Sequence, residues 1–388
     1  MTMTSPRARA HASGGGDIGR VGRGPHGSGD GAGHARARRL RREPVMLDTA
    51  YNPRSNSLDV MRLLLASAVA VVHAFATAFG WQPQIGSSQI GALAVDGFFV
   101  LSGFLITSSF LRLSPGRYVW HRFLRIMPAF WTCLVVTAFV FAPLLAVLEG
   151  RAAASALTGP DPSWRYITDN ALLYIRDFGV AGLPSGTASP GVINGALWTL
   201  FYEVVCYGMI LVLGIVGALT RHRWVPHLVV ALSGVMLVLP MVGIEVRGAL
   251  FWRFFFVFTL GALAYLHRDR IPVSRWLTIA SVALVVGSSL LMADYRPLGG
   301  AAFAYLCLMA VVGTPFLRFR LRTDLSYGVY VYHWPVQTVL VTAGISAAWP
   351  TFAYVFVSVA GAFALAFASW HLIEKRALGA KNAFKKAG

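Results

Sequence analysis

The ionisable residues inside the apolar segments of this chain are its best candidates for chemistry. Arg62 and His73 are 11 residues apart in the first apolar segment. At about 100° per residue, this spacing puts both side chains on one face of a helix, roughly 16 Å apart along its axis. An imidazole titrates near neutral pH and is the commonest general base. His73 is therefore a candidate general base, although a histidine that only joins two helices by a hydrogen bond fits the same position.

Two carboxylates lie in later apolar segments, Asp96 in the second and Glu203 in the fourth. Counted from the outer end of each segment, both lie about 12 Å deep, at a level similar to that of His73. An ionisable side chain at this depth is costly and is therefore a functional candidate. We expect His73, Asp96 and Glu203 to converge on one buried site, where a carboxylate would orient the imidazole. The alternative is that one carboxylate pairs with an arginine inside the membrane, such as Arg253.

An arginine-rich turn follows the second apolar segment. Arg122 and Arg125 are three residues apart and would lie on one face of a helix. Guanidinium groups bind phosphate through paired hydrogen bonds, so these two are candidates for holding a phosphate-bearing donor in the cytoplasm. Membrane topology alone also places arginines in cytoplasmic turns. His333 precedes Pro335 by two residues in a later apolar segment and could line the path of the donor or have a structural role.

The composition is that of a membrane protein. The chain has 388 residues, of which 56% are hydrophobic, and its mean hydropathy is +0.60. These values are too apolar for a soluble protein of this length. The formal charge of +18 does not indicate a nucleic-acid partner, because the charges follow membrane topology. The three cysteines all lie in apolar segments without metal-ligand spacing, and we expect neither a metal nor a permanently bound cofactor.

Ten segments are long enough to cross a bilayer, at about 20 residues each. They cover approximately residues 57–79, 88–111, 126–148, 195–217, 224–241, 248–266, 274–292, 298–317, 325–344 and 350–373. The predicted fold class is all-α, a polytopic integral membrane bundle of about ten transmembrane helices. Residues 1–54 form a basic tail that we expect to be disordered. Residues 55–376 form the membrane domain, and residues 377–388 a second basic tail.

Loop arginines indicate the orientation of these segments. With the N-terminus in the cytoplasm, twelve loop arginines lie inside, and the outer five are Arg151, Arg165, Arg176, Arg247 and Arg296. This bias obeys the positive-inside rule, so we expect both termini in the cytoplasm. The one long connection, residues 149–194, is then outside. It could serve as a binding loop or lid, or only as a linker.

Several motifs occur in the order typical of a known family. They are Asn56-Ser-Leu-Asp59-Val-Met-Arg62 leading to His73, Asp96-Gly-Phe-Phe-Val-Leu-Ser102-Gly103-Phe, Arg122-x-x-Arg125-Ile-x-Pro128, Trp198-x4-Glu203, Ser326-Tyr327-x-x-Tyr330-x-x-His333-x-Pro335 and Ile373-Glu374. Together, over residues 55–376, the chain resembles the acyltransferase family 3, the O-acetylase-type integral membrane acyltransferases. One departure is His121-Arg122, where an Arg-Arg pair is commoner.

The resemblance implies transfer of an acyl group, most often acetyl, from a coenzyme A thioester to a sugar hydroxyl. It implies His73 as the base with Arg62 as its partner, Glu203 in support, and Arg122 and Arg125 at the donor. Acyl-coenzyme A would be a co-substrate, a carbohydrate the acceptor, and a bacterial plasma membrane the location. We expect the acceptor to be a cell-envelope or exported polysaccharide. The alternatives are a secreted small-molecule glycoside of the macrolide type, a proton-coupled transporter or flippase, and a non-enzymatic membrane scaffold.

Residues and resemblance together give one set of expected site residues. Catalysis is assigned to His73, Glu203 and Asp96, and donor binding to Arg62, Arg122, Arg125 and His333.

Overall fold

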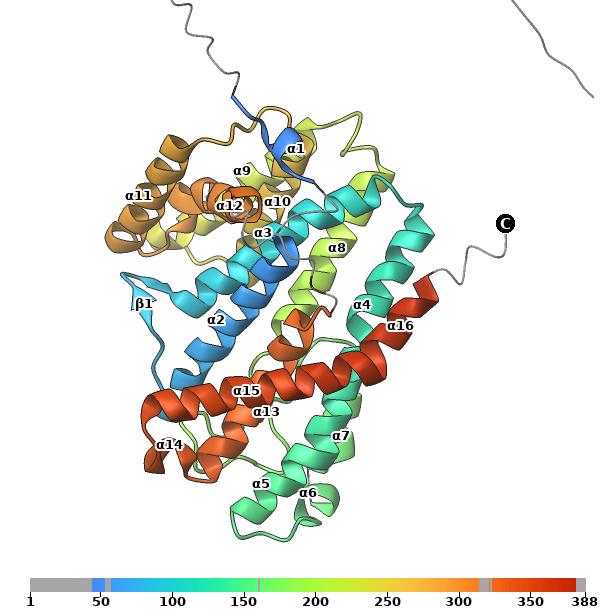
Figure 1. Cartoon of the computed structure of the whole chain (residues 1–388), viewed down its shortest axis with the longest axis vertical. Helices are drawn as coiled ribbons and strands as arrows, with labels where there is room; N and C mark the ends of the chain where they lie inside the picture. The colour runs from blue at the N-terminus through green and yellow to red at the C-terminus, as the bar shows by residue number, and fades with distance from the viewer. Residues whose placement is uncertain (1–43, 53–56, 160, 314–320, 322, 382–388) are drawn as a thin grey trace, which may run out of the picture. The chain divides into compact units, whose positions relative to one another are not determined.

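Each of the ten predicted spans is occupied by a helix (Figure 1). The computed structural model of the chain describes residues 44–52, 57–159, 161–313, 321 and 323–381. Of the tail expected to be disordered, residues 1–54, residues 1–43 and 53–54 lie outside the described residues, as does the end of the second basic tail, residues 382–388. Residues 44–52 are described and include a short helix, so the expected disorder does not extend to them.

The helices in the predicted spans follow the sequence order. They are α2 (Leu58–Phe79), α3 (Ile90–Phe110), α4 (Pro115–Val136) with η1 (Thr137–Phe141) and α5 (Ala142–Leu148), α8 (Thr199–Ile215), α9 (Trp224–Val238) with η2 (Leu239–Val242), α10 (Ala249–Leu266), α11 (Arg275–Leu291), α12 (Arg296–Gly313), α13 (Ser326–Thr342), and α15 (Thr351–Ser369) with η4 (Trp370–Glu374) and α16 (Lys375–Gly379). Short helices are α1 (Leu47–Ala50), α6 (Ser155–Thr158), α7 (Ser163–Asn170) and α14 (Ile345–Ala348). The strands β1 (Gln84–Ile85) and β2 (Ser88–Gln89) form an antiparallel pair.

Within the described part of the chain, seven helical stretches are long and apolar enough to cross a membrane. They are α2, α3, α4 to α5, α9 to η2, α10, α12, and α15 to α16. The other three helices in predicted spans, α8, α11 and α13, have 17 residues each. The fold class, a helical membrane protein, is confirmed. The number of crossings and their orientation stay predictions.

The third helical stretch begins earlier than its apolar composition predicts. It starts at Pro115, behind the N-cap Ser114, whereas the predicted span starts at residue 126. Proline is favoured in the first turn of a helix, because its missing N–H has no partner there in any case. Arg122 and Arg125 therefore lie within α4 and not in a turn between helices.

The helix α3 is held at the centre of the bundle by close backbone contacts with α10. A Cβ on Gly103 would lie 2.0 Å from the Phe258 carbonyl oxygen, and one on Gly261 would lie 2.0 Å from the Val100 carbonyl oxygen. Small residues allow this close approach of two membrane helices. Figure 1 shows α9 to α12 gathered beside α3, while α13 and α15 pack near α2. The face of α3 that is directed away from α10 is thus free to line a site with α2, α8 and α13.

Candidate functional site: a histidine pair between an inner cavity and an outer cleft

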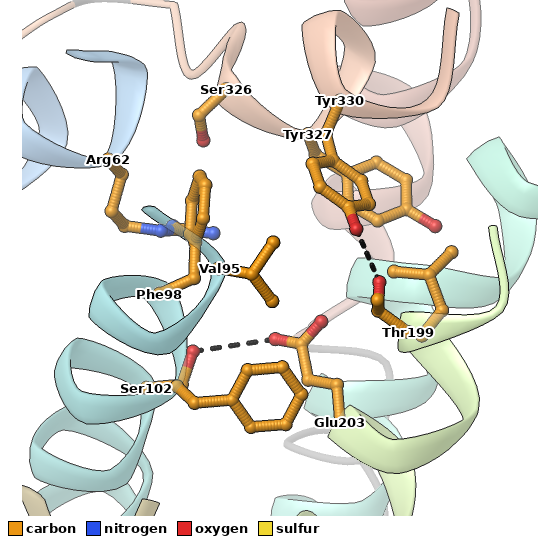
Figure 2. Close-up of a pocket in the computed structure, with 11 residues that line it drawn as sticks. Arg62, Val95, Phe98, Ser102, Thr199, Glu203, Ser326, Tyr327 and Tyr330 are labelled. Carbon is orange, nitrogen blue, oxygen red and sulfur yellow. Dashed lines mark hydrogen bonds between the residues drawn. The ribbon is translucent and has the colours of Figure 1, made fainter. Parts of the chain in front are cut away.

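A small cavity of about 40 Å³ lies between α2, α3, α8 and α13 (Figure 2). It is called the inner cavity, because Arg62 and Ser326 in its lining lie near helix ends that are predicted to be cytoplasmic. Arg62 reaches it from α2 and Glu203 from α8. The Ser102 hydroxyl of α3 donates a hydrogen bond of 3.4 Å to the Glu203 carboxylate. The Tyr207 hydroxyl donates to the same carboxylate oxygen. Arg62 and Glu203, both expected site residues, therefore line the same cavity.

Two of the expected donor-binding arginines share one carboxylate oxygen. The Oδ2 atom of Asp324 lies 3.2 Å from Nη1 of Arg62 and 2.5 Å from Nη2 of Arg125. Burial alone would raise the pKa of Asp324, but the two guanidinium groups outweigh it and hold this pKa below its usual range. Sequence reasoning missed Asp324. Its signal was an acid at the inner end of α13, two residues before the motif that begins at Ser326.

Arg122 lies apart from this ion pair. Its guanidinium carbon is 5.9 Å from the centroid of the Tyr207 ring, and its Nε is buried with no hydrogen-bond partner among the described residues. Within the described chain, Asp324 is the one acid that pairs with Arg62, Arg122 or Arg125. Arg122 is thus the one of these three arginines that forms no salt bridge among the described residues, which leaves its guanidinium available to a phosphate-bearing ligand.

His73 and His333 form a hydrogen-bonded pair between α2 and α13. Nδ1 of His73 lies 2.9 Å from Nε2 of His333, with the ring planes inclined by 23°. Nδ1 of His333 lies 3.2 Å from the Val329 carbonyl oxygen. Because a carbonyl oxygen can only accept, neutral His333 has its proton on Nδ1, and its Nε2 accepts from Nδ1–H of His73. Nε2 of His73 then has a free lone pair, which is the form that a general base requires.

The sequence of α13 explains how this pair is held. Gln337 follows His333 by four residues, on the same helix face, and its Nε2 donates to the Ala70 carbonyl of α2 at 2.7 Å. Pro335 has no N–H, which leaves the Val331 carbonyl without its helical partner. Asn194 supplies the missing donor, with Nδ2 3.0 Å from the Val331 oxygen. These contacts fix α13 both to α2 and to the connection before α8.

Trp334 lies between the histidine pair and two clefts, which are called the outer clefts because they lie at the end of the site that is predicted to be extracytoplasmic. Its ring centroid is 4.9 Å from that of His73, and the indole borders clefts of about 510 and 800 Å³. Ala76 of α2 and Gly80, the C-cap residue that follows α2, line the larger one. At about 100° per residue, these two fall within roughly 60° of Arg62 and His73 around the helix axis. One face of α2 therefore runs from the inner cavity, past His73, to the larger outer cleft.

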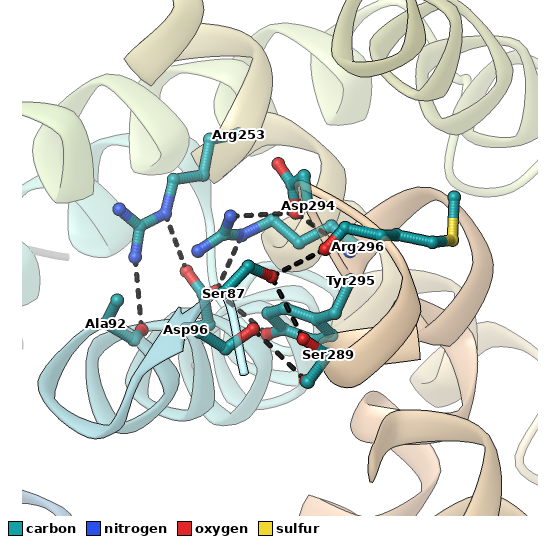
Figure 3. A network of polar contacts seen from close by, with 10 residues as sticks. Ser87, Ala92, Asp96, Arg253, Ser289, Asp294, Tyr295 and Arg296 are labelled. Atoms are coloured by element: carbon teal, nitrogen blue, oxygen red, sulfur yellow. Dashed lines mark hydrogen bonds and ion pairs between the residues drawn. The ribbon is translucent and has the colours of Figure 1, made fainter. Parts of the chain in front are cut away.

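Asp96 does not lie beside His73. Its Oδ1 accepts a bond of 3.0 Å from Nε of Arg253, and its Oδ2 accepts bonds of 2.7 Å from Nε of Arg296 and 2.9 Å from the Tyr295 hydroxyl (Figure 3). The carboxylate is completely buried. The expectation that Asp96 would orient the imidazole is wrong, because its oxygens are bonded elsewhere. The alternative, a pairing with Arg253, is confirmed.

Helix faces explain why the three predicted groups do not converge. Val95 and Ser102 of α3 line the inner cavity, and Asp96 is turned about 100° from Val95, toward α10 and α12. The helix α8 begins at Thr199, whose hydroxyl is 2.5 Å from that of Tyr330 in the wall of the cavity. Glu203, one turn further along, therefore reaches the inner cavity and not the level of His73. A similar predicted depth therefore did not identify a shared site.

The family can now be stated. A family model described as an acyltransferase domain (Acyl_transf_3) matches residues 55–371. The chain belongs to acyltransferase family 3. It is 28% identical to the "O-acetyl transferase" of Shigella phage Sf6, over 84% of this chain and 96% of that protein. It is 27% identical to "Nodulation protein 10" of Rhizobium leguminosarum bv. viciae, over 83% and 93%, and 25% identical to "Exopolysaccharide production protein ExoZ" of Rhizobium meliloti, over 74% and 89%. No solved structure matches the chain.

This acyltransferase family 3 protein is thus a membrane enzyme that transfers acyl groups, and a transporter or a non-enzymatic scaffold has no support. Its structure brings Arg62, Arg125 and Glu203 to the inner end of the site and joins His73 to His333. His333 was expected either along the donor path or in a structural role. It is hydrogen-bonded to His73, a contact that sequence spacing did not reveal.

Proposed function

We propose that this acyltransferase moves an acyl group, most simply acetyl, from a coenzyme A thioester to a sugar hydroxyl of a polysaccharide that a bacterium exports. The observation that carries the proposal is the single face of α2 that joins the inner cavity at Arg62, the histidine pair at His73 and the outer cleft at Gly80. A cytoplasmic donor and an extracytoplasmic acceptor would approach His73 from opposite ends of this face.

The charge at the inner end supports coenzyme A as the donor. Coenzyme A has several phosphates, and Arg62, Arg122 and Arg125 outnumber the one acid that pairs with them among the described residues. The cavity of about 40 Å³ has no room for a nucleotide. We therefore propose that the nucleotide of coenzyme A binds at the arginines and that only its narrow thioester-bearing arm extends toward His73.

The tautomer of His73 defines the chemistry. Nε2 of His73 removes the proton of the acceptor hydroxyl as its oxygen attacks the thioester carbonyl. The tetrahedral intermediate then breaks its C–S bond, and the proton on Nε2 passes to the departing sulfur. The products are the sugar ester and free coenzyme A. His333 accepts from Nδ1 of His73 throughout, so the imidazolium that forms is hydrogen-bonded on that side.

The relatives support the acyl group and the acceptor. One is named an O-acetyl transferase and another an exopolysaccharide production protein. A bacterial plasma membrane with both termini in the cytoplasm agrees with the loop arginines, since that orientation leaves five of them outside. It also puts the arginine-rich end of the site on the side where acyl-coenzyme A is made.

The test follows label from radioactive acetyl-coenzyme A into the products of inverted membrane vesicles from a bacterium that makes the protein. We expect base-labile label in the polysaccharide fraction, and none from vesicles of the deletion strain. Label in a small glycoside fraction would replace the polysaccharide by the second acceptor class. Vesicles that contain the protein but label no fraction beyond the deletion strain would contradict the proposal.

A further inference from the structure

The larger outer cleft has the composition of a sugar-binding site. It holds about 800 Å³, and its lining includes two tryptophans, three glutamines and a serine but no charged side chain. These residues are Trp81, Trp334, Gln82, Gln84, Gln89 and Ser189. Aromatic faces and neutral hydrogen-bonding groups suit an uncharged polyhydroxy ligand. An acidic ligand would find no counter-ion among these residues.

The hairpin of β1 and β2 presents two of the glutamines together. Gln84 is the register partner of Gln89, so their side chains project to the same side of the hairpin, and both line the cleft. Ser88, one position along, projects the other way, and its hydroxyl is 3.1 Å from that of Ser289 in α11. The backbone N–H of Ser87 donates to the Ser289 carbonyl at 2.9 Å. The hairpin tip is thus fixed to α11, and the two amides belong to an anchored wall.

Trp334 offers a hydrogen-bond donor that the protein does not use. Its side chain is 8% exposed, and its indole N–H is buried without a partner among the described residues. A buried donor without an acceptor destabilises a fold, so an oxygen of a ligand would be favourable there. Because the same indole borders both the cleft and His73, a ligand that it binds would lie next to the catalytic base.

Trp81 provides the aromatic face at the cleft. It follows Gly80 at the end of α2, is 52% exposed, and packs against Phe75 with ring centroids 5.0 Å apart. The face of an indole is electron-rich and attracts the C–H groups of a pyranose ring. Each glutamine amide has donors and an acceptor on one plane, which matches neighbouring sugar hydroxyls.

We infer that this cleft binds an uncharged pyranose unit of the acceptor, with Trp81 against the face of the sugar and Gln84 and Gln89 on its hydroxyls. A sugar hydroxyl that accepts from the Trp334 indole N–H would then lie next to His73, whose ring centroid is 4.9 Å from that of the indole. This inference rests on the proposed function and adds the place, the charge and the ring type of the acceptor.

The experiment measures saturation-transfer NMR of the full chain in nanodiscs, which does not depend on acyl transfer. The probes are neutral methyl pyranosides of glucose, galactose and rhamnose, methyl glucuronide, and 1,2-cyclohexanediol. The variant is Trp81→Ala, and the matched control is Trp164→Ala, because Trp164 is an exposed tryptophan (58%) on α7 and not in the lining of this cleft. We expect signal from a neutral pyranoside that Trp81→Ala lowers at least fivefold and Trp164→Ala leaves unchanged.

Two results would overturn the inference. One is that no neutral pyranoside gives more signal than methyl glucuronide and cyclohexanediol. The other is an equal signal in the two tryptophan variants. In the acyl-transfer assay, Trp81→Ala should raise KM for a pyranoside acceptor about tenfold and leave KM for acetyl-coenzyme A unchanged. Sugar binding without His73-dependent transfer would contradict the proposed function but not the sugar site, so the two failures are distinguishable.

Discussion

Nδ1 of His73 and Nε2 of His333 lie 2.9 Å apart, so one imidazole sets the tautomer of the other. The Val329 carbonyl keeps the proton of His333 on Nδ1, which obliges Nε2 to accept. The proposed base, His73, is thus hydrogen-bonded to a second histidine, where the sequence suggested a carboxylate. A carboxylate would stabilise the imidazolium more strongly, but no acid within the described chain bonds to His73.

Replacing His333 by phenylalanine should lower kcat about 100-fold and leave KM for acetyl-coenzyme A unchanged. The phenyl ring keeps the packing but cannot accept from Nδ1–H, so His73 loses its preferred tautomer. His333→Gln offers an amide oxygen as acceptor and should recover part of the rate. The measurement is initial-rate kinetics, with His371→Phe as control because His371 is exposed on η4. Unchanged kcat in His333→Phe would contradict the positioning role.

Asp324→Asn should lower the free energy of unfolding by about 3 kcal/mol at pH 7, because it leaves Arg62 and Arg125 without their shared anion. The folded-state pKa of Asp324 lies below its usual value, so its stabilisation is complete above that value and is lost as pH falls through the folded pKa. The midpoint of thermal unfolding, measured by intrinsic fluorescence, should be lower for the variant than for wild type at pH 7. The difference in stability between wild type and variant should begin to narrow below about pH 4, near the ordinary pKa of an aspartate, and should close as pH falls through the lower folded-state pKa. A difference that is constant with pH would contradict this assignment.

Asp96→Asn and Glu203→Gln should affect different properties. Asp96 is bonded to Arg253 and Arg296 away from the cavity, so its loss should cost about 4 kcal/mol of stability while the folded fraction keeps its kcat. Glu203 lines the inner cavity, so its loss should lower kcat per folded molecule at least tenfold. Activity per amount of monodisperse folded protein distinguishes a loss of stability from a loss of kcat in each variant. A large loss of normalised kcat in Asp96→Asn would restore its catalytic assignment.

Arg122→Gln should raise KM for acetyl-coenzyme A about tenfold without destabilising the protein, since Arg122 has no acidic partner among the described residues. Added salt should narrow the difference in KM for acetyl-coenzyme A between wild type and variant, because it screens the attraction between phosphate and guanidinium. Arg165→Gln is the matched control, since Arg165 lies on α7, is 54% exposed and is expected outside. Equal KM values in the two variants would remove Arg122 from the donor site.

Most of the fold could be predicted from hydropathy, because a segment that spans a bilayer must be apolar and helical. The predicted start of α4 was wrong for the same reason. Its first residues, from Pro115 to Arg125, include three arginines and a histidine, which lower the mean hydropathy of this stretch, yet they belong to the same helix. Hydropathy reports the apolar part of a helix, not its ends.

The site was less predictable, because its partners are distant in sequence. His73 and His333 are 260 residues apart, and depth in the membrane did not indicate which helix faces meet. Asp96 lies on a face of α3 that is directed toward Arg253 and Arg296, while Asp324 lies just outside an apolar segment and had no expected role. The spacing of Arg62 and His73 did predict that they lie on one helix, because both belong to the continuous helix α2.

The most direct test of the central claim is acyl-donor turnover by purified wild type and His73→Ala in nanodiscs, with labelled acetyl-coenzyme A and the polysaccharide fraction as acceptor. Both proteins must first show the same elution volume and unfolding midpoint. We predict that His73→Ala lowers turnover about 1000-fold while acetyl-coenzyme A binds as before. Equal turnover in the two proteins would contradict the role of His73 as the base and direct attention to His333.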